Sequence, residues 1–177
     1  MYDLHSILIQ LKKEDTPLHG VMVRCVRCFY QWLDPTLWEG SALFELWAQE
    51  LELIYGDLRQ RLSPNAKTDA GSLGDRFGFD TPPELPRLLQ SIQTFYSVLI
   101  KLIAWNTLRG ATPEPPLTEL LSGRAFVNRG IRNFCGDDWY IWPLDIWDPA
   151  LETQCEELRA CLETFDTCPE GSTHSPD

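Results

Sequence analysis

Two cysteines three residues apart, Cys25 and Cys28, have a spacing that could support chemistry. A CxxC pair can hold zinc or act as a redox couple. A zinc site needs further ligands, but the cysteines at 155, 161 and 168 are spaced by six and seven residues, and His5 and His19 are isolated. The pair also falls inside a predicted helix, where residues i and i+3 share a face. Reduced, partly buried thiols are the main interpretation, and a small zinc-stabilised regulator remains an alternative.

Four aspartates, Asp137, Asp138, Asp145 and Asp148, could form a divalent-ion site or a pair of catalytic carboxylates. Adjacent carboxylates on a short loop are usually solvated, so we interpret them as surface charges. No histidine has a serine or cysteine nearby in the setting of a nucleophile, and no glycine-containing stretch follows a strand and opens a helix. The sequence therefore predicts no catalytic residue, no cofactor-binding residue and no metal ligand, and we expect the chain not to be an enzyme.

Four large aromatic residues, Trp139, Tyr140, Trp142 and Trp147, lie close together near the C-terminal end. Aromatic platforms that stack on nucleic-acid bases normally lie in basic grooves. Here residues 133–177 contain eleven Asp and Glu against one Arg. Core packing, or docking onto another protein domain, is therefore the better interpretation, and these four residues are the predicted partner-docking site.

The overall charge excludes several classes of partner. The chain has 177 residues, with 15 Lys and Arg against 26 Asp and Glu, so its net charge is -11. This charge opposes non-specific binding to nucleic acid or to an anionic membrane surface. Because the first residues lack the basic start of a secretory signal, we expect a cytoplasmic protein.

The elements that must position these residues are predicted to be helices. Residues 83–108 form the central one, apolar on every face from Phe95 to Trp105 apart from Ser97 and Lys101. A membrane span needs about 20 consecutive apolar residues, and this run is shorter and interrupted by Lys101. We expect a helix in a protein core, with no membrane partner.

Further helices are expected at residues 2–13, 17–33, 41–62, 116–121 and 149–165. Thr16 and Asp148 are suitable N-caps, and each is followed by a proline, which suits the first helical position. Residues 63–82 are expected to be a long loop, and residues 133–148 a short extended or irregular segment.

The predicted fold is all-α, an irregular bundle of four to six helices. Residues 1–166 form a single domain and residues 167–177 a disordered tail. Leu99, Leu102 and Ile103 of the central helix should be buried together with Trp47 and Ile54.

Five stretches of the sequence carry a resemblance to a known family. They are LFELW at 43–47, IYGDL at 54–58, FYSVLIKLIA at 95–104, GIRNF at 130–134 and GDDWYIW at 136–142. In order and spacing these stretches, within residues 40–166, resemble a helical region that precedes the catalytic core of large bacterial N6-adenine DNA methyltransferases of restriction–modification and phage-defence systems.

The resemblance implies a non-catalytic role. The Asn/Asp-Pro-Pro-Tyr/Phe tetrapeptide of that family and its glycine loop for S-adenosylmethionine do not occur in this sequence. The resemblance therefore implies a truncated or separately encoded helical domain that acts as a scaffold for a methyltransferase core not in this chain, supplied by a partner or by missing sequence. An independent acidic helical interaction module is the alternative.

Overall fold

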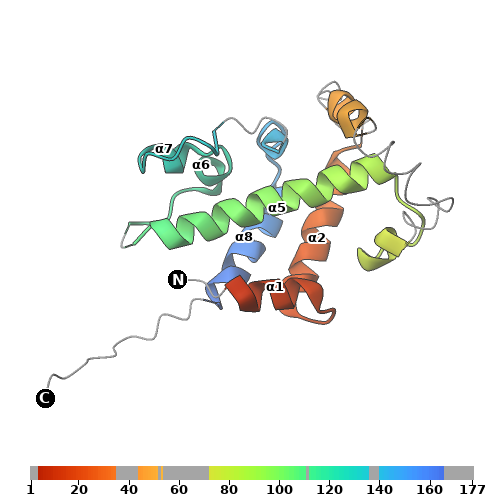
Figure 1. The fold of residues 1–177 in the computed structure, drawn as a ribbon, viewed down its shortest axis with the longest axis horizontal. Coiled ribbons are helices and arrows are strands. Elements are labelled where there is room, and N and C mark those ends of the chain that lie inside the picture. Colours follow the sequence, from red (N-terminus) through yellow and green to blue (C-terminus); the bar gives the residue numbers. More distant parts are fainter. Residues whose placement is uncertain are drawn as a thin grey trace, which may run out of the picture.

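The computed structural model describes residues 4–34, 44–51, 53, 72–110, 112–135 and 140–165. Within these ranges all regular structure is helical and no strand occurs, which confirms the all-α prediction. Residues 44–51 and 72–76 are helical, and the remaining elements, labelled as in Figure 1, are α1 (Leu4–Lys12), α2 (Pro17–Trp32), α5 (Leu85–Leu108), α6 (Leu117–Leu121), α7 (Arg124–Val127), the 3-10 helix η1 (Trp142–Leu144) and α8 (Pro149–Glu163).

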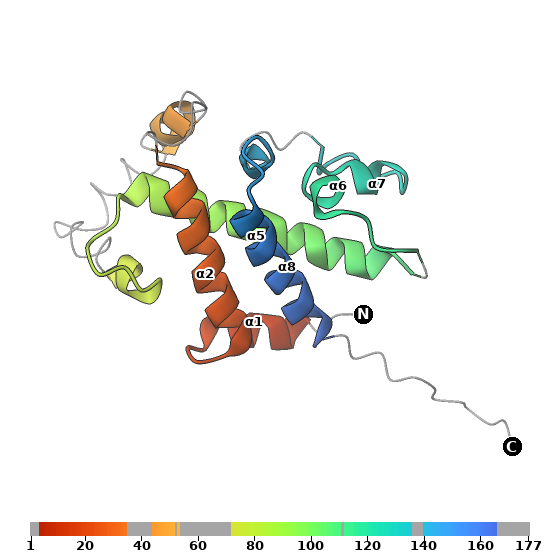
Figure 2. The ribbon, with the colours of Figure 1, turned by 180° about the vertical axis from the view of Figure 1, so that it is seen from behind.

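Helix α5 crosses the whole fold, and the other helices are arranged on it. Helices α2 and α8 lie side by side against one side of α5, as Figure 2 shows from behind. Helix α1 lies across the start of α2 and the end of α8, and α6 and α7 lie near the C-terminal half of α5 (Figure 1). The main core lies between α2, α5 and α8, where Phe29, Phe95 and Leu158 are fully buried.

The ends of two helices follow from their caps, as predicted. The Thr16 side-chain oxygen accepts a hydrogen bond from the backbone N–H of His19 at 3.3 Å, and α2 begins at Pro17. The Asp148 carboxylate accepts one from the N–H of Ala150 at 2.7 Å, and α8 begins at the next residue. Each cap satisfies an N–H group that has no partner inside the helix.

The buried surface of α5 agrees with the prediction in part. Leu99 and Leu102 are buried and Ile103 is half-buried. Trp47 is also buried, but it does not belong to the main core cluster. Ile54 lies outside the described residues.

Helix α5 contributes many residues to the core, as expected, but not every face of it is buried. Tyr96 and Ile100, four residues apart, are 43% and 53% exposed, so none of the described helices covers this stripe of α5. Lys101, in contrast, is only 2% exposed and its Nζ donates to the carbonyl of Leu121 at 2.8 Å. The lysine therefore satisfies a carbonyl at the end of α6, where intrahelical partners are missing.

By length and composition α5 would also pass as a membrane-crossing helix. Of its most apolar stretch of 18 residues, 56% is buried inside the fold. One such helix is weak evidence for a membrane span.

The long-loop prediction for residues 63–82 is wrong at residues 72–76, which are helical. Phe77, directly after them, is buried in the main core and anchors this turn. A Cβ on Gly74 would lie 2.5 Å from the Cδ of Pro83, so the close approach of the two segments requires glycine. Residues 63–71 lie outside the described residues.

Two short elements near the C-terminal end complete the fold. The predicted turns at 116–121 correspond to α6, while α7 was not predicted. Gly123 joins them with a φ of 78°, and a Cβ there would lie 2.4 Å from the backbone oxygen of Phe134. In the aromatic segment the 3-10 turn η1 confirms an irregular backbone between residues 140 and 148. The predicted tail, 167–177, and most of the predicted helix 41–62 lie outside the described residues.

Candidate functional site

The predicted docking residue Trp142 is a core residue and offers no surface to a partner. Its side chain is 1% exposed and its Nε1 donates to Oγ1 of Thr94 on α5 at 2.9 Å. Its ring meets Phe29 of α2 edge to face, with 5.9 Å between the ring centroids. The physical reason is its position on η1, which places the indole between α2 and α5 beside a buried acceptor.

The other predicted docking residues are less buried. Tyr140 is half-buried, and its hydroxyl donates to Oε1 of Gln93 on α5 at 2.6 Å. Trp147 is half-buried and packs against the core. Trp139 lies outside the described residues. Tyr140 and Trp147 therefore keep only part of their surface available to a partner.

The CxxC pair contributes thiols to the interface of α2 and α8. Cys25 is buried and its Sγ donates to the carbonyl of Gln154 at 3.4 Å. Burial raises the pKa of Cys25 well above its usual value, and it raises the pKa of Cys28 to about 11 and that of Cys155 to about 12. Thiols with raised pKa values are poor nucleophiles and poor metal ligands at neutral pH.

The predicted acidic and histidine candidates do not converge. Asp148 caps α8, Asp145 is exposed, and the carboxylates of 137 and 138 lie outside the described residues. His19 is buried in α2. Among the residues described, no three His, Cys, Asp or Glu side chains are grouped in a way that could hold a metal ion.

An open hollow between four segments of the described chain is the candidate site. It has a volume of about 500 Å³ and is formed by α1, α2, the turn at 72–77 and α5. Its floor consists of the buried side chains of Leu11, Met22 and Phe77, and its walls of the half-buried Leu73 and Ile92. We call this hollow, together with its exposed rim of Leu8, Lys12, Arg76 and Tyr96, the α1–α5 groove.

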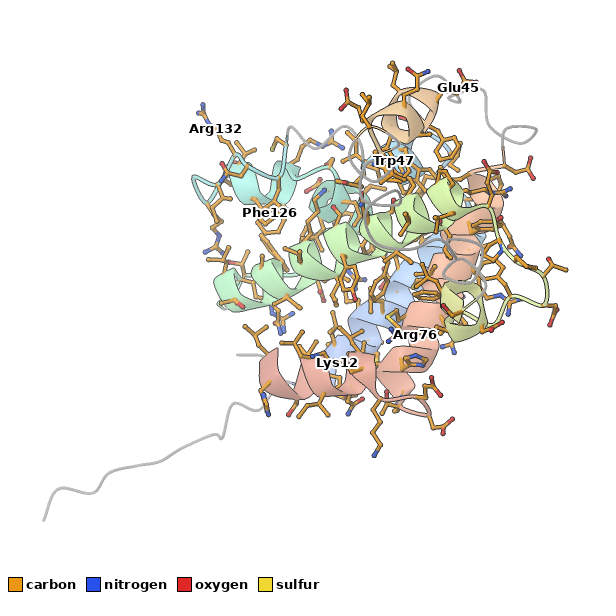
Figure 3. The ribbon with its side chains drawn as sticks, turned by 45° about the vertical axis from the view of Figure 1, so that its right-hand side comes forward. Lys12, Glu45, Trp47, Arg76, Phe126 and Arg132 are labelled. Carbon is orange, nitrogen blue, oxygen red and sulfur yellow. The ribbon has the colours of Figure 1, made fainter. Side chains whose placement is uncertain are left out.

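The rim of the α1–α5 groove combines two exposed apolar side chains with two cations. Leu8 of α1 is 55% exposed and lines the hollow together with the exposed Tyr96 of α5. Lys12 of α1 and Arg76 complete the lining, and Figure 3 shows them close to one another below α5. Among the residues that the structure describes, no carboxylate lines the hollow.

The apolar rim continues beyond the hollow along both helices. Leu4, one turn before Leu8, is 56% exposed, and the exposed Ile100 lies one turn after Tyr96. Helices α1 and α5 run in opposite directions across this part of the fold, so Leu4 and Ile100 extend the two stripes toward the same end (Figure 1). The candidate site is therefore an elongated surface with exposed apolar side chains on both helices.

Sequence reasoning missed this site because its parts come from four separate segments. One local signal was present in the sequence. The apolar stripe of residues 4–12, formed by Leu4, Ile7, Leu8 and Leu11, is wider than the surface that a helix buries against one neighbouring helix. Only Ile7 and Leu11 of this stripe are buried. The positions of Lys12 and Arg76 beside one hollow follow from the tertiary fold alone.

Comparisons with models of protein families, with curated proteins and with solved structures found no match to this chain. The resemblance to adenine methyltransferases stays a prediction from the sequence, and the function has to be argued from the groove.

Proposed function

We propose that this chain is a non-catalytic helical scaffold domain that binds another protein domain through the α1–α5 groove. The observation that carries the proposal is the exposure of Leu8 and Tyr96 on either side of an apolar hollow. Contiguous apolar surface on a soluble domain usually marks an interaction site.

For the identity of the partner we propose an N6-adenine DNA methyltransferase core in another polypeptide, in a restriction–modification or phage-defence system. Support comes from the five resembling stretches of sequence. The longest of them, residues 95–104, contains both Tyr96 of the groove and the exposed Ile100. Because the sequence lacks the catalytic tetrapeptide and the cofactor loop of that family, we favour a scaffold role over a catalytic one.

An independent acidic interaction module is the second candidate. Trp142 and Tyr140 make hydrogen bonds to α5, so the aromatic segment completes this fold and does not depend on a further domain to cover it. This observation favours a chain that is stable by itself and binds its partner reversibly.

The partner proposal is tested with the two recombinant polypeptides. The chain would be mixed with a methyltransferase core encoded beside its gene, and the complex measured by sedimentation and by transfer of tritiated methyl groups to DNA. We expect a stoichiometric complex. Separate sedimentation of the two polypeptides would refute the methyltransferase partner and favour the independent module.

The isolated chain should not bind S-adenosylmethionine. Calorimetric titration with the cofactor would give no binding heat, because the residues that hold it in the family do not occur in this sequence. Saturable binding at about micromolar affinity, roughly 8 kcal/mol of binding free energy, would contradict the non-catalytic assignment.

A further inference from the structure

We infer that the occupant of the α1–α5 groove is an acid-rich amphipathic helix of a partner protein. The inference rests on the interaction role proposed above and specifies the chemistry of the partner segment. It does not depend on whether that partner is a methyltransferase.

The shape of the groove favours a helix over a small molecule. Pockets for small ligands enclose most of the ligand surface. Here Leu8, Lys12, Arg76 and Tyr96 are all exposed, so the hollow is open on its outer side. Its apolar stripes continue for a further turn on α1 and on α5. A helix lying between two such stripes presents side chains at positions i, i+4 and i+7 to both of them.

The charge at the rim selects an acidic partner. Lys12 and Arg76 have no hydrogen-bonding or ion-pair partner within the described residues, whereas Arg24 pairs with Glu157 at 2.8 Å and Arg87 with Asp34 at 3.5 Å. Since no carboxylate lines the hollow, the two cations remain available to carboxylates of a bound helix.

A second copy of this chain lacks a suitable helix in its described part. Helix α8 carries Glu152, Glu156, Glu157 and Glu163, but its apolar side is fully buried in the core. It could occupy the groove of another copy only by leaving its own fold. An anionic membrane surface is disfavoured by the net charge of -11.

The test uses the full chain and two model peptides labelled with fluorescein. Both place Leu at positions i, i+4, i+7 and i+11 of an 18-residue helix, and their remaining positions carry mainly Glu in one peptide and mainly Lys in the other. Fluorescence anisotropy measures binding. We expect the Glu peptide to bind at least about tenfold more tightly than the Lys peptide, a difference of about 1.4 kcal/mol.

Charge reversal at the rim provides the decisive comparison. Lys12→Glu combined with Arg76→Glu should weaken the Glu peptide by about tenfold or more, and Tyr96→Ala should also weaken it. The matched control is Lys13→Glu, an exposed cation next to Lys12 that does not line the hollow, which should change binding less than about twofold. Thermal melting followed by circular dichroism checks that every variant is folded.

Several results would overturn the inference. The inference is overturned if the two peptides bind equally well or if the Glu peptide does not bind. It is also overturned if Lys13→Glu and the double reversal reduce the affinity for the Glu peptide equally. Self-association of the chain that the double reversal abolishes would identify a second copy as the occupant. Sedimentation with vesicles containing phosphatidylglycerol that depends on Lys12 and Arg76 would identify a lipid surface. A methyltransferase core that binds the double-reversal variant normally would sustain the proposed methyltransferase partner while refuting an acid-rich helix as the occupant of the groove.

Discussion

Replacing Trp142 by alanine should destabilise the fold strongly, although the sequence suggests a docking residue at this position. The indole is buried between α2 and α5, so truncation leaves a cavity in addition to losing apolar burial. Substitutions of this kind cost about 3 to 5 kcal/mol. Loss of the hydrogen bond from Nε1 to Thr94 adds about 1 kcal/mol.

This loss is a large part of the stability of a domain of this size, since unfolding free energies are typically about 5 to 15 kcal/mol. Urea denaturation followed by circular dichroism measures it directly. In thermal unfolding, a total loss of about 4 to 6 kcal/mol at about 2 to 4 °C for each kcal/mol predicts a melting temperature lower by about 8 to 24 °C.

Trp147→Ala is the matched control. Trp147 belongs to the same segment but is half-buried, and its ring nitrogen donates no hydrogen bond within the described part of the chain. Trp147→Ala should therefore lower the unfolding free energy clearly less than Trp142→Ala does. A loss below about 1 kcal/mol for Trp142→Ala, comparable to a surface substitution, would refute the buried placement of the indole.

The hydrogen bond itself can be separated from the packing. A double-mutant cycle with Trp142→Phe and Thr94→Val should give a coupling energy of about 0.5 to 1.5 kcal/mol. Thr94→Val also removes the bond from Oγ1 to the carbonyl of Gln90 at 2.8 Å, but it does so with either residue at position 142, so this loss cancels and the cycle isolates the contact with the indole. Additive effects within about 0.3 kcal/mol would show that the two side chains do not interact.

Three further predictions concern the core, a cap and the thiols. Leu99→Ala, in the buried face of α5, should cost about 2 to 5 kcal/mol in urea denaturation, and a cost near zero would contradict its burial. Asp148→Ala should cost about 0.5 to 2 kcal/mol, while Asp148→Asn should retain most of the stability, because either side chain can accept from the N–H of Ala150. The pKa of Cys155 is raised from 9.0 to about 12 by burial, so the unfolding free energy should be unaffected below pH 9 and fall as pH rises through this range. Cys155→Ala should reduce that fall in alkaline denaturation, and an unchanged alkaline slope would argue against the buried thiol.

Helix limits could be predicted from the sequence wherever local chemistry determines them. Thr16 and Asp148 each precede a proline, and both the cap and the fixed φ of proline act within a few residues. The buried face of α8 was likewise predictable, since Leu151 and Leu158 follow the helical repeat and both are fully buried.

The environment of individual residues on α5 could not be predicted in the same way. Lys101 interrupts an apolar run and suggests a solvent-exposed position, yet its long side chain reaches a carbonyl of α6 twenty residues away in sequence. Ile100, its neighbour, is apolar and exposed. Both outcomes depend on which helices pack around α5, and the periodicity of a helix apolar on nearly every side does not reveal that arrangement.

The candidate site was less predictable still, because the sequence draws attention to residues that the fold uses internally. Trp142 is a large apolar side chain with one polar atom, and the fold supplies Thr94 as the partner of that atom inside the core. The groove instead uses Leu8 and Tyr96 on its rim, which look like ordinary core positions of two amphipathic helices. Leu8 and Tyr96 stay exposed because α1 does not lie over the exposed stripe of α5.

The charge distribution gives the groove its selectivity. A chain with net charge -11 repels acidic partners at long range, but this repulsion is screened beyond about 8 to 10 Å at moderate salt. Within that distance a ligand in the groove meets Lys12 and Arg76 and no lining carboxylate. An acidic segment without apolar side chains gains too little from two exposed cations to bind, since surface ion pairs are worth at most about 1 kcal/mol each. An apolar segment without acids leaves the cations without partners. The surface therefore discriminates in favour of a segment that has both properties, and an amphipathic helix presents them side by side.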